Sequence, residues 1–423
     1  MKRRYLLLAG LIISTLFLWQ CKSLLSNKSK TSDNTVKTLP ALTNSEQKIA
    51  TTSQTFGIDL FKNVDDSAKG ENVFLSPLSL SMALAMTTNG AKNNTRTAMM
   101  KTLEMPNMSV SDMNASYQNL TKLLINADPN VKMEIANSIW YQNNFNVLNN
   151  FIQTCENYYG AKVKGLDFGK SSSADTINHW VSDKTHGHIQ KMVRFPFPPK
   201  TVMYLMNAIY FKGNWRYQFD KKNTQTGDFT LSNGSVVHPE MMHMTATLPM
   251  YQSSDVKMID MAYGDSLYSM TVLLPLKGTN IDQFVSNLTQ SKLNTWIGKL
   301  SRTKVDVTFP RFKISYKDIL NGVLQNMGMG IAFSIKNADF TNINPDKSLH
   351  LHISQVKQKS YIDVDETGTE AAAVTSISMV FTSVSTPQNQ AIPFVANRPF
   401  VYLIRERSSG TILFIGKMEN PVL

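Results

Sequence analysis

The sequence predicts one large body of the mixed α/β class, with helices and strands in the irregular order of an α+β fold. The chain has 423 residues, of which 42% are hydrophobic, so it can bury a sizeable core. Apolar residues recur at helical spacing in residues 77–90 and form a continuous run typical of a buried strand in residues 201–211. We find no β-α repeat, no internal repeat and no linker between residues 46 and 423. These observations favour a single domain.

The chain begins with a segment typical of an export signal. Residues 1–20 carry three basic residues at positions 2–4, followed by an apolar run from 5 to 19. Cys21 stands where a bacterial lipoprotein signal places the residue that is lipidated and becomes the mature N-terminus. The alternative is an uncleaved anchor. In both cases we expect an exported protein of the outer membrane or cell surface, facing the extracellular space or the periplasm.

Residues 21–44 combine the lipidated cysteine with a stretch rich in Ser, Thr, Asn and Lys, which predicts a flexible linker. The folded domain is then expected to span residues 45–423. The other cysteine of the chain, Cys155, leaves no disulfide framework, although the protein is expected to be exported. Its apolar surroundings predict a small buried side chain rather than a nucleophile.

The charge pattern argues against several classes of partner. The chain has 43 Lys and Arg against 31 Asp and Glu, a net charge of +12, but no dense basic run with interleaved aromatics. Nucleic acid is therefore not an expected partner. His179, His186 and His188 have no Cys or carboxylate at metal-ligand spacing, so we expect surface histidines and no metal or cofactor. The usual nucleophile-elbow, P-loop and zinc-protease motifs are missing, so the protein is not expected to be an enzyme.

Helix and strand signals cover most of the domain. The expected helices are one that Asn44 or Ser45 caps, one that Ser76 and Pro77 start and Gly90 ends, a short one that starts with 177–181, and one through 320–327 that Gly328 closes. The expected strands are 135–141, 201–211, 267–274 and 304–309, with a hairpin of 400–404 and 412–415 around 408–410. Asn207 lies in the middle of an apolar strand and must therefore find hydrogen-bond partners.

The segment 363–397 is unusual for a connection. It starts with the acidic run 363–366, and from residue 371 to 397 it contains no charged residue. As a strand it would place Glu370 in water and small residues on the other face, followed there by larger apolar ones. The residues of that inner face are Thr369, Ala371, Ala373, Thr375, Ile377 and Met379. Small inward residues are what a strand needs in order to enter between two existing strands.

Several blocks in order resemble the serpin family. They are Asn-Val-Phe-Leu-Ser-Pro-Leu-Ser at 72–79, Asn-Ala-Ile-Tyr-Phe-Lys-Gly-Asn-Trp at 207–215, Phe-Pro-Arg-Phe at 309–312, Gly-Met at 328–329, Asp-Glu-Thr-Gly-Thr-Glu-Ala-Ala-Ala at 365–373 and Asn-Arg-Pro-Phe at 397–400. The resemblance covers nearly all of residues 46–423. It implies three β-sheets, eight to nine helices and an exposed reactive-centre loop, in a protein that is expected to be a monomer.

The resemblance also implies an activity. In serpins a serine protease cleaves the loop as if it were a substrate, the acyl-enzyme is trapped, and the loop inserts into the main sheet. Family spacing from Glu366 places the scissile bond between Thr382 and Ser383, which favours elastase-like proteases. A register one residue earlier would present Phe381 and favour chymotrypsin-like proteases.

Other functional residues follow from the family blocks. The hinge residues have the small side chains of inhibitory members; they are Glu366, Gly368, Thr369, Glu370, Ala371, Ala372 and Ala373. Ser76, Ser79 and Asn207 match a buried polar cluster in which Gln358 replaces the usual His, so we expect no pH response there. Glu366 and Arg311 match a salt bridge at the top of the sheet, beside Trp215.

Alternatives remain open at this point. The chain could be a non-inhibitory surface lipoprotein on the serpin scaffold, or an inhibitor that also traps cysteine proteases. The acidic residues of 363–370 could form a carboxylate dyad or a cation site, although a strand edge that leads into the hinge explains them better. Heparin activation is not expected, because Lys122 is the basic residue of segment 109–125.

Overall fold

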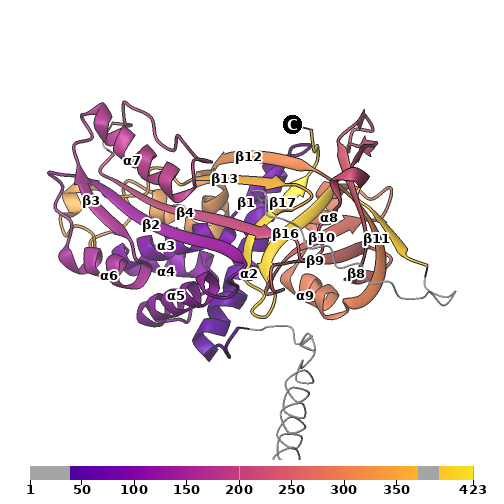
Figure 1. Cartoon of the computed structure of the whole chain (residues 1–423). Helices are drawn as coiled ribbons and strands as arrows, with labels where there is room; N and C mark the ends of the chain where they lie inside the picture. Colours follow the sequence, from indigo (N-terminus) through magenta and orange to yellow (C-terminus); the bar gives the residue numbers. More distant parts are fainter. Residues whose placement is uncertain (1–38, 200, 370–389, 423) are drawn as a thin grey trace, which may run out of the picture. The chain divides into compact units, whose positions relative to one another are not determined.

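The computed structural model describes residues 39–199, 201–369 and 390–422. These residues fold into mixed helices and strands, which confirms the predicted class (Figure 1). The described residues contain nine α-helices: α2 (Asn44–Ser67), α3 (Pro77–Gly90), α4 (Asn93–Thr102), α5 (Val110–Ile125), α6 (Asn149–Tyr159), α7 (Ser171–Lys184), α8 (Ile281–Ser286), α9 (Gln290–Gly298) and α10 (Asn321–Leu324). Within this part of the chain, no helix is both long and apolar enough to cross a membrane.

The strands of the described residues form three sheets. The one that matters most for function, which we call the main sheet, has six strands. Their order is β12 (Phe312–Ile319), β13 (Lys357–Val364), β14 (Gly368–Thr369), β4 (Met203–Asn214), β2 (Val131–Gln142) and β3 (Lys162–Leu166). Neighbours are antiparallel except β2 and β3, which are parallel.

A larger sheet contributes many buried hydrophobic side chains to the core. Its order is β1 (Val73–Leu75), β17 (Ile412–Met418), β16 (Phe400–Glu406), β10 (Tyr268–Pro275), β9 (Val256–Tyr263), β8 (Glu240–Gln252), β11 (Ser301–Pro310) and β15 (Ile392–Val395), with β5 (Gln225–Thr226) beside β8. A third, two-stranded sheet pairs β6 (Phe229–Thr230) with β7 (Val236–Val237). Every residue of β10, β16 and β17 is buried, including the charged side chains of Arg405, Glu406 and Lys417.

The start of α2 lies slightly before the predicted position. Thr43, not Asn44 or Ser45, is the N-cap: its hydroxyl accepts from the Glu46 amide, and the Glu46 carboxylate accepts from the Thr43 amide. Leu39 is buried and its amide donates to the Ser408 hydroxyl. The described end of the segment predicted as a linker is therefore packed against the domain.

The central helix α3 is confirmed with its predicted ends. The Ser76 hydroxyl accepts from the Ser79 amide and Pro77 occupies the first turn. Most of its residues are buried, and they pack against β4 and β17.

Other elements run beyond their predicted bounds. The helix predicted at 177–181 is part of the longer α7, and the strand predicted at 135–141 is part of the longer β2. The hairpin around 408–410 is confirmed, with Gly410 at a φ of 75°. The stripe predicted to be one helix to Gly328 is short α10 followed by a π-helical turn, in which Gly328 has a φ of 105°.

The main sheet is covered on both faces (Figure 1). Helix α7 lies over its outer face, where Trp140, Trp180 and Met206 belong to a separate small core. Helices α3 and α5 lie on the inner face, against β4 and β2. Along β4 and β13, even and odd positions therefore face different surroundings.

A buried charge cluster joins β9, β10 and β16. The Asp260 carboxylate, on β9, lies 3.1 Å from Arg405 and 3.0 Å from Arg407, and it accepts from the Thr271 hydroxyl at 2.6 Å. Burial alone would raise the pKa of Asp260, but the charges of the two guanidinium groups hold it below its ordinary value. The cluster therefore supplies stability while Asp260 is ionised.

We expect Asp260→Asn to lower the free energy of unfolding by about 3–5 kcal/mol at pH 7, because the buried Arg405 and the half-buried Arg407 lose their counter-charge. Because the folded-state pKa is depressed, the wild-type advantage is complete above the unfolded pKa of about 3.9 and declines as pH falls below it. Urea unfolding of both proteins across this range measures the difference. Asp66→Asn, at the exposed pair with Lys69, is the control and should cost less than about 1 kcal/mol. Equal urea midpoints for Asp260→Asn and wild type at pH 7 would contradict the argument.

Candidate functional site

The predicted hinge begins inside the main sheet. Gly368 pairs with Asn214 of β4, Thr369 pairs with Gly213, and Thr369 also pairs with Val364 of β13. These two residues form β14, which separates β13 from β4 at this end of the sheet. The structure thus starts a new strand between two others at the point where sequence analysis placed the hinge.

A tight turn delivers the chain to β14. The Asp365 carboxylate accepts from the amides of Thr367 and Gly368 at 2.8 and 3.1 Å, and its own amide donates to the Gly368 carbonyl. Asp363 pairs instead with Lys313 at 3.0 Å. The acidic residues of this segment therefore close a turn and pair across strands, as expected of a strand edge that leads into the hinge.

Trp215 holds this turn in place, as its predicted position beside the hinge suggested. Its indole N–H donates to the Asp365 carbonyl at 2.9 Å, and its backbone amide donates to Thr367 at 2.8 Å. The indole stacks on Tyr263, with ring centroids 4.4 Å apart. The buried Tyr263 hydroxyl in turn bonds to the Thr369 hydroxyl. Tyr263 was not predicted as part of this site, because nothing near it in the sequence relates it to the hinge.

The predicted salt bridge between Glu366 and Arg311 does not form. Glu366 is 3% exposed; one carboxylate oxygen accepts from the Thr224 hydroxyl at 2.8 Å, and the other has no hydrogen-bond partner among the described residues. Arg311 is exposed. The physical reason is the turn that feeds β14, since it fixes the Glu366 carbonyl to the Phe219 amide and directs the carboxylate toward Thr224.

A polar cluster lies on the inner face of the main sheet, formed by Ser76, Ser79, Asn137, Asn207 and Gln358. The Ser79 hydroxyl donates to the Asn207 side chain, which donates to Asn137 at 2.6 Å. Gln358 accepts from the Ser76 amide at 3.2 Å and donates to the Ser76 carbonyl at 2.8 Å. Asn207 thus finds the partners that its buried position demands. Asn137 was not predicted, although a lone Asn within the strand signal at 135–141 could have indicated it.

The cluster has two halves on different strands. Asn207 belongs to β4 and Gln358 to β13, and in the described chain these strands pair with β14 but not with each other. Gln358 both donates and accepts, and its amide stays neutral at all relevant pH values. The polar cluster therefore satisfies its own groups without an ionisable side chain.

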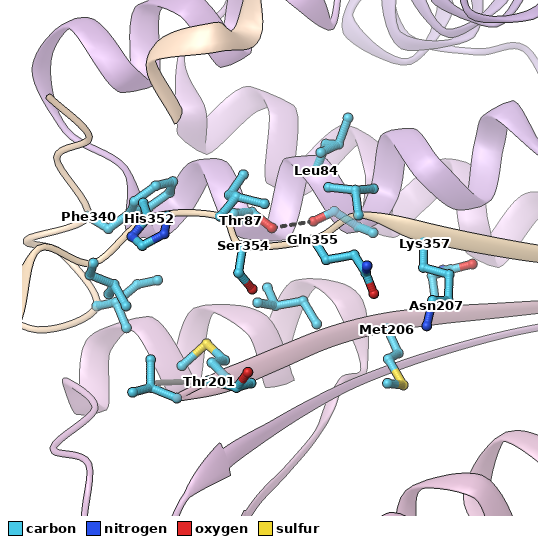
Figure 2. A pocket seen from close by; sticks show the side chains of 18 of the residues that line it. Leu84, Thr87, Thr201, Met206, Asn207, Phe340, His352, Ser354, Gln355 and Lys357 are labelled. Atoms are coloured by element: carbon cyan, nitrogen blue, oxygen red, sulfur yellow. Dashed lines mark hydrogen bonds between the residues drawn. The ribbon is translucent and has the colours of Figure 1, made fainter. Parts of the chain in front are cut away.

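Beyond β14, a cavity of about 570 Å³ lies between β4 and β13 (Figure 2). We call this opening the slot. One wall is residues 201–207, the other is residues 348–359, and α3 supplies the floor with Ser79, Leu84 and Thr87. The polar cluster contributes Ser79, Asn207 and Gln358 to its lining. The slot is thus a continuation of the gap that β14 occupies.

The segment after α7 bridges the outer face of the main sheet. The His186 ring bonds to Glu134 of β2 at 3.0 Å and packs on Tyr210 of β4, with centroids 4.2 Å apart. His188 stacks on Tyr361 of β13, with centroids 4.3 Å apart. The two histidines, expected as surface residues, thus contact strands on both sides of the slot.

The remaining predicted residues fall into two groups. Cys155 is buried, and burial raises the pKa of its thiol to about 12, as expected for a side chain that is not a nucleophile. The lipidation site, the rest of the hinge and the reactive bond lie outside the described residues; these are Cys21, Glu370, Ala371, Ala372, Ala373, Phe381, Thr382 and Ser383.

Gly368 offers a test of β14. A Cβ atom at this position would lie 2.2 Å from the Gly213 carbonyl oxygen and 2.7 Å from the Asn214 Cα, both backbone atoms that cannot yield. We expect Gly368→Ala to displace β14, so that hydrogen exchange of the amides of residues 213–215 becomes at least about tenfold faster, a loss of ~1.4 kcal/mol in local stability. Mass-spectrometric hydrogen exchange measures this. Gly322→Ala, where a Cβ meets nothing within 4 Å, should leave exchange in this region unchanged. Unchanged protection in Gly368→Ala would mean that β14 is not held by this close approach.

Comparisons with known proteins agree with this geometry. A sequence model of the family described as "Serpin (serine protease inhibitor)" matches residues 51–421. The chain is 30% identical to the leukocyte elastase inhibitor of Equus caballus, over 89% of this chain and 100% of that protein. The match to the family covers both the polar cluster and the hinge.

Solved structures show the same fold. The native state of tengpin, a thermophilic serpin, has a TM-score of 0.80 and 32% identity, covering 90% of this chain and 96% of tengpin. Human thyroxine-binding globulin, solved with thyroxine, has a TM-score of 0.80 and 27% identity, covering 89% of this chain and 99% of that one. With a family match over most of its length, this chain is a member of the serpin family.

Proposed function

We propose that this protein inhibits serine proteases as a suicide substrate: a protease cleaves the segment 363–397, remains attached as an acyl-enzyme, and is carried along as the segment inserts into the slot. Inhibition of serine proteases is the general activity that the family and the leukocyte elastase inhibitor support. The observation that carries the proposal of loop insertion is β14. This short strand is paired with both β13 and β4, and the slot continues the gap that it occupies.

The strand register supports insertion of the residues that follow. The observed pairs are Gly368–Asn214 and Thr369–Gly213. If insertion continued this register, Ala371 would come opposite Phe211, Ala373 opposite Ile209 and Thr375 opposite Asn207. Thr369 is buried on the inner face, so these three residues would share that face. Small side chains would thus pass over the core, and a hydroxyl would reach the polar cluster.

The same register brings larger apolar residues to the cavity. Ile377 would lie opposite Leu205 and Met379 opposite Met203, two residues that line the slot. Their burial would contribute roughly 1.5–3 kcal/mol each. A dozen strand residues at about 0.5–1.5 kcal/mol per hydrogen bond would add on the order of 10 kcal/mol. The uncleaved protein would then be metastable and held by kinetics.

The scissile bond of the proposal is Thr382–Ser383. A small β-branched residue before the bond suits elastase-like proteases, whereas cleavage after Phe381 would indicate chymotrypsin-like ones. We further propose that Cys21 is lipidated, so that the inhibitor is tethered at the surface of the exporting cell and meets secreted proteases there.

A second candidate is a non-inhibitory role. Thyroxine-binding globulin shows that the fold can serve a protein that binds a small molecule. The small side chains at Thr369, Ala371, Ala372 and Ala373 favour inhibition, because a binding role would not require them. Trapping of cysteine proteases by the same loop is compatible with these residues.

Mixing the full chain with pancreatic elastase, neutrophil elastase and chymotrypsin tests the proposal. We expect a complex that survives boiling in detergent. We also expect mass spectrometry to find a released C-terminal peptide with the mass of residues 383–423. Cleavage without a complex for all three enzymes would exclude inhibition of these targets. Cleavage without a rise in thermal stability would exclude loop insertion itself.

Thr369→Arg tests the direction of the hinge. Thr369 is already buried in β14, so Arg at this inward position would have to bury its charge for the hinge to stay paired while the segment inserts. We expect the variant to be cleaved as a substrate with at least about a tenfold smaller yield of complex, or ~1.4 kcal/mol in the partition between trapping and release. Glu370→Arg places the same charge on the predicted outer face and should leave the yield near wild type. Equal yields for both variants would refute the inward position of Thr369 during insertion.

A further inference from the structure

The slot has the shape and lining of a small-molecule site. Its volume of about 570 Å³ lies within the range of roughly 300–1,000 Å³ that is usual for ligand pockets. Apolar side chains from three parts of the chain line it: Leu80, Leu84, Met203, Leu205, Phe340 and Ile343. An elongated apolar group would therefore be sheltered from water along most of its length.

The charge of the slot is of one sign. Its lining contains no Asp or Glu, and its charged residues are Lys357 and Lys359, with His350 and His352 nearby in the same wall. The Lys357 ammonium donates to the Met192 carbonyl at 3.4 Å. Among the described residues, neither lysine has a carboxylate partner within 4 Å; the ammonium groups donate instead to the backbone carbonyls of Met192 and Lys191.

Further cations surround the two lysines. Lys317 of β12 lies directly opposite Lys359 of β13, an unfavourable like-charge pair. Burial, together with the charges of Lys317 and Arg194, lowers the pKa of both Lys357 and Lys359. An anion at this place would relieve the repulsion that the chain itself leaves uncompensated.

Polar groups complete the site. Figure 2 shows Gln355 directed from one wall toward β4, whose Met206 and Asn207 lie across the slot. Thr87 and Ser354 add hydroxyls near the same wall. Such groups can orient the head of a ligand whose body lies among the apolar side chains.

We propose that the slot binds an amphipathic monoanion, such as a medium-chain alkyl carboxylate, with its carboxylate at Lys357 and Lys359 and its chain along Leu84, Met203 and Phe340. The segment 371–397 carries no charge, so its insertion would not neutralise these lysines. Charge complementarity thus favours a separate anionic ligand over a neutral one.

Binding there regulates the inhibitor, a consequence that rests on the proposed function. The register places Ile377 and Met379 in the space that the alkyl chain takes, so ligand and loop exclude each other. A protein with an occupied slot is cleaved more often without trapping its protease. The ligand thereby shifts the chain from inhibitor toward substrate.

Titration calorimetry of the full chain tests the site, with decanoate, decanol and decylamine below their aggregation limits as probes. We expect decanoate to bind with one-to-one stoichiometry, decanol at least tenfold more weakly, and decylamine without measurable heat. The double variant K357Q/K359Q should lose at least tenfold in affinity for decanoate and keep its affinity for decanol. Lys304→Gln, a cation on β11 outside the slot, is the matched control.

The outcomes separate the inference from the proposed function. Equal binding of decanoate and decanol, unchanged affinity in the double variant, or full displacement by inorganic phosphate would each overturn the amphipathic site. If the inference holds, decanoate raises the amount of inhibitor consumed per trapped protease several-fold, and loop-cleaved protein no longer binds it. If decanoate binds as expected but no protease is ever trapped, the site stands and the inhibitory function fails.

Discussion

The structure depends on one constraint in the main sheet: in the described part of the chain, β4 and β13 pair with β14 but not with each other. Strands normally complete their backbone hydrogen bonds with their neighbours, and an unfilled gap leaves donors and acceptors open to a further strand. Among the residues that the structure describes, the short strand β14 fills the gap at one end. Everything that we assign to function follows from how the rest of the gap is filled.

The residues around the gap fall into two kinds. At the hinge, Trp215, Tyr263 and Asp365 hold a turn that aims the chain between the strands. Farther along, each half of the polar cluster bonds to the start of α3 rather than to the other strand, Asn207 to Ser79 and Gln358 to Ser76. Because Asn207 and Gln358 find their partners without bonding to each other, β4 and β13 can lie apart without leaving either buried side chain unpaired.

The slot therefore has two competing uses. One use is to receive the neutral segment after β14, with its small and then apolar inward residues, and the other is to hold a separate ligand. The uncharged loop segment cannot neutralise Lys357 and Lys359. These unpaired positive charges are what indicates an anionic ligand. The outer segment with His186 and His188 closes over the same strands, so the slot is enclosed by protein on more than one side.

The sequence by itself determined the class, the family blocks, the central helix α3 and the strand-like character of the hinge. These are local properties. Ser76 and Pro77 are favoured residues at the start of a helix, and Thr369 and Glu370, as neighbours in a strand, point to opposite faces. Asn207 had to find partners, and this too could be stated in advance. The ends of α2 and α7 moved by a few residues because capping and packing compete locally.

The tertiary structure alone decided which distant residues meet. Glu366 reaches Thr224 rather than Arg311 because the turn before β14 sets its direction, and no pattern in the chain encodes that direction. Tyr263 and Asn137 join the site through contacts across more than a hundred and about seventy residues of sequence, respectively. The slot exists only once β4 and β13 are placed side by side and apart. Sequence periodicity fixes which face a side chain takes, whereas the separation of two strands is a property of the whole packed sheet.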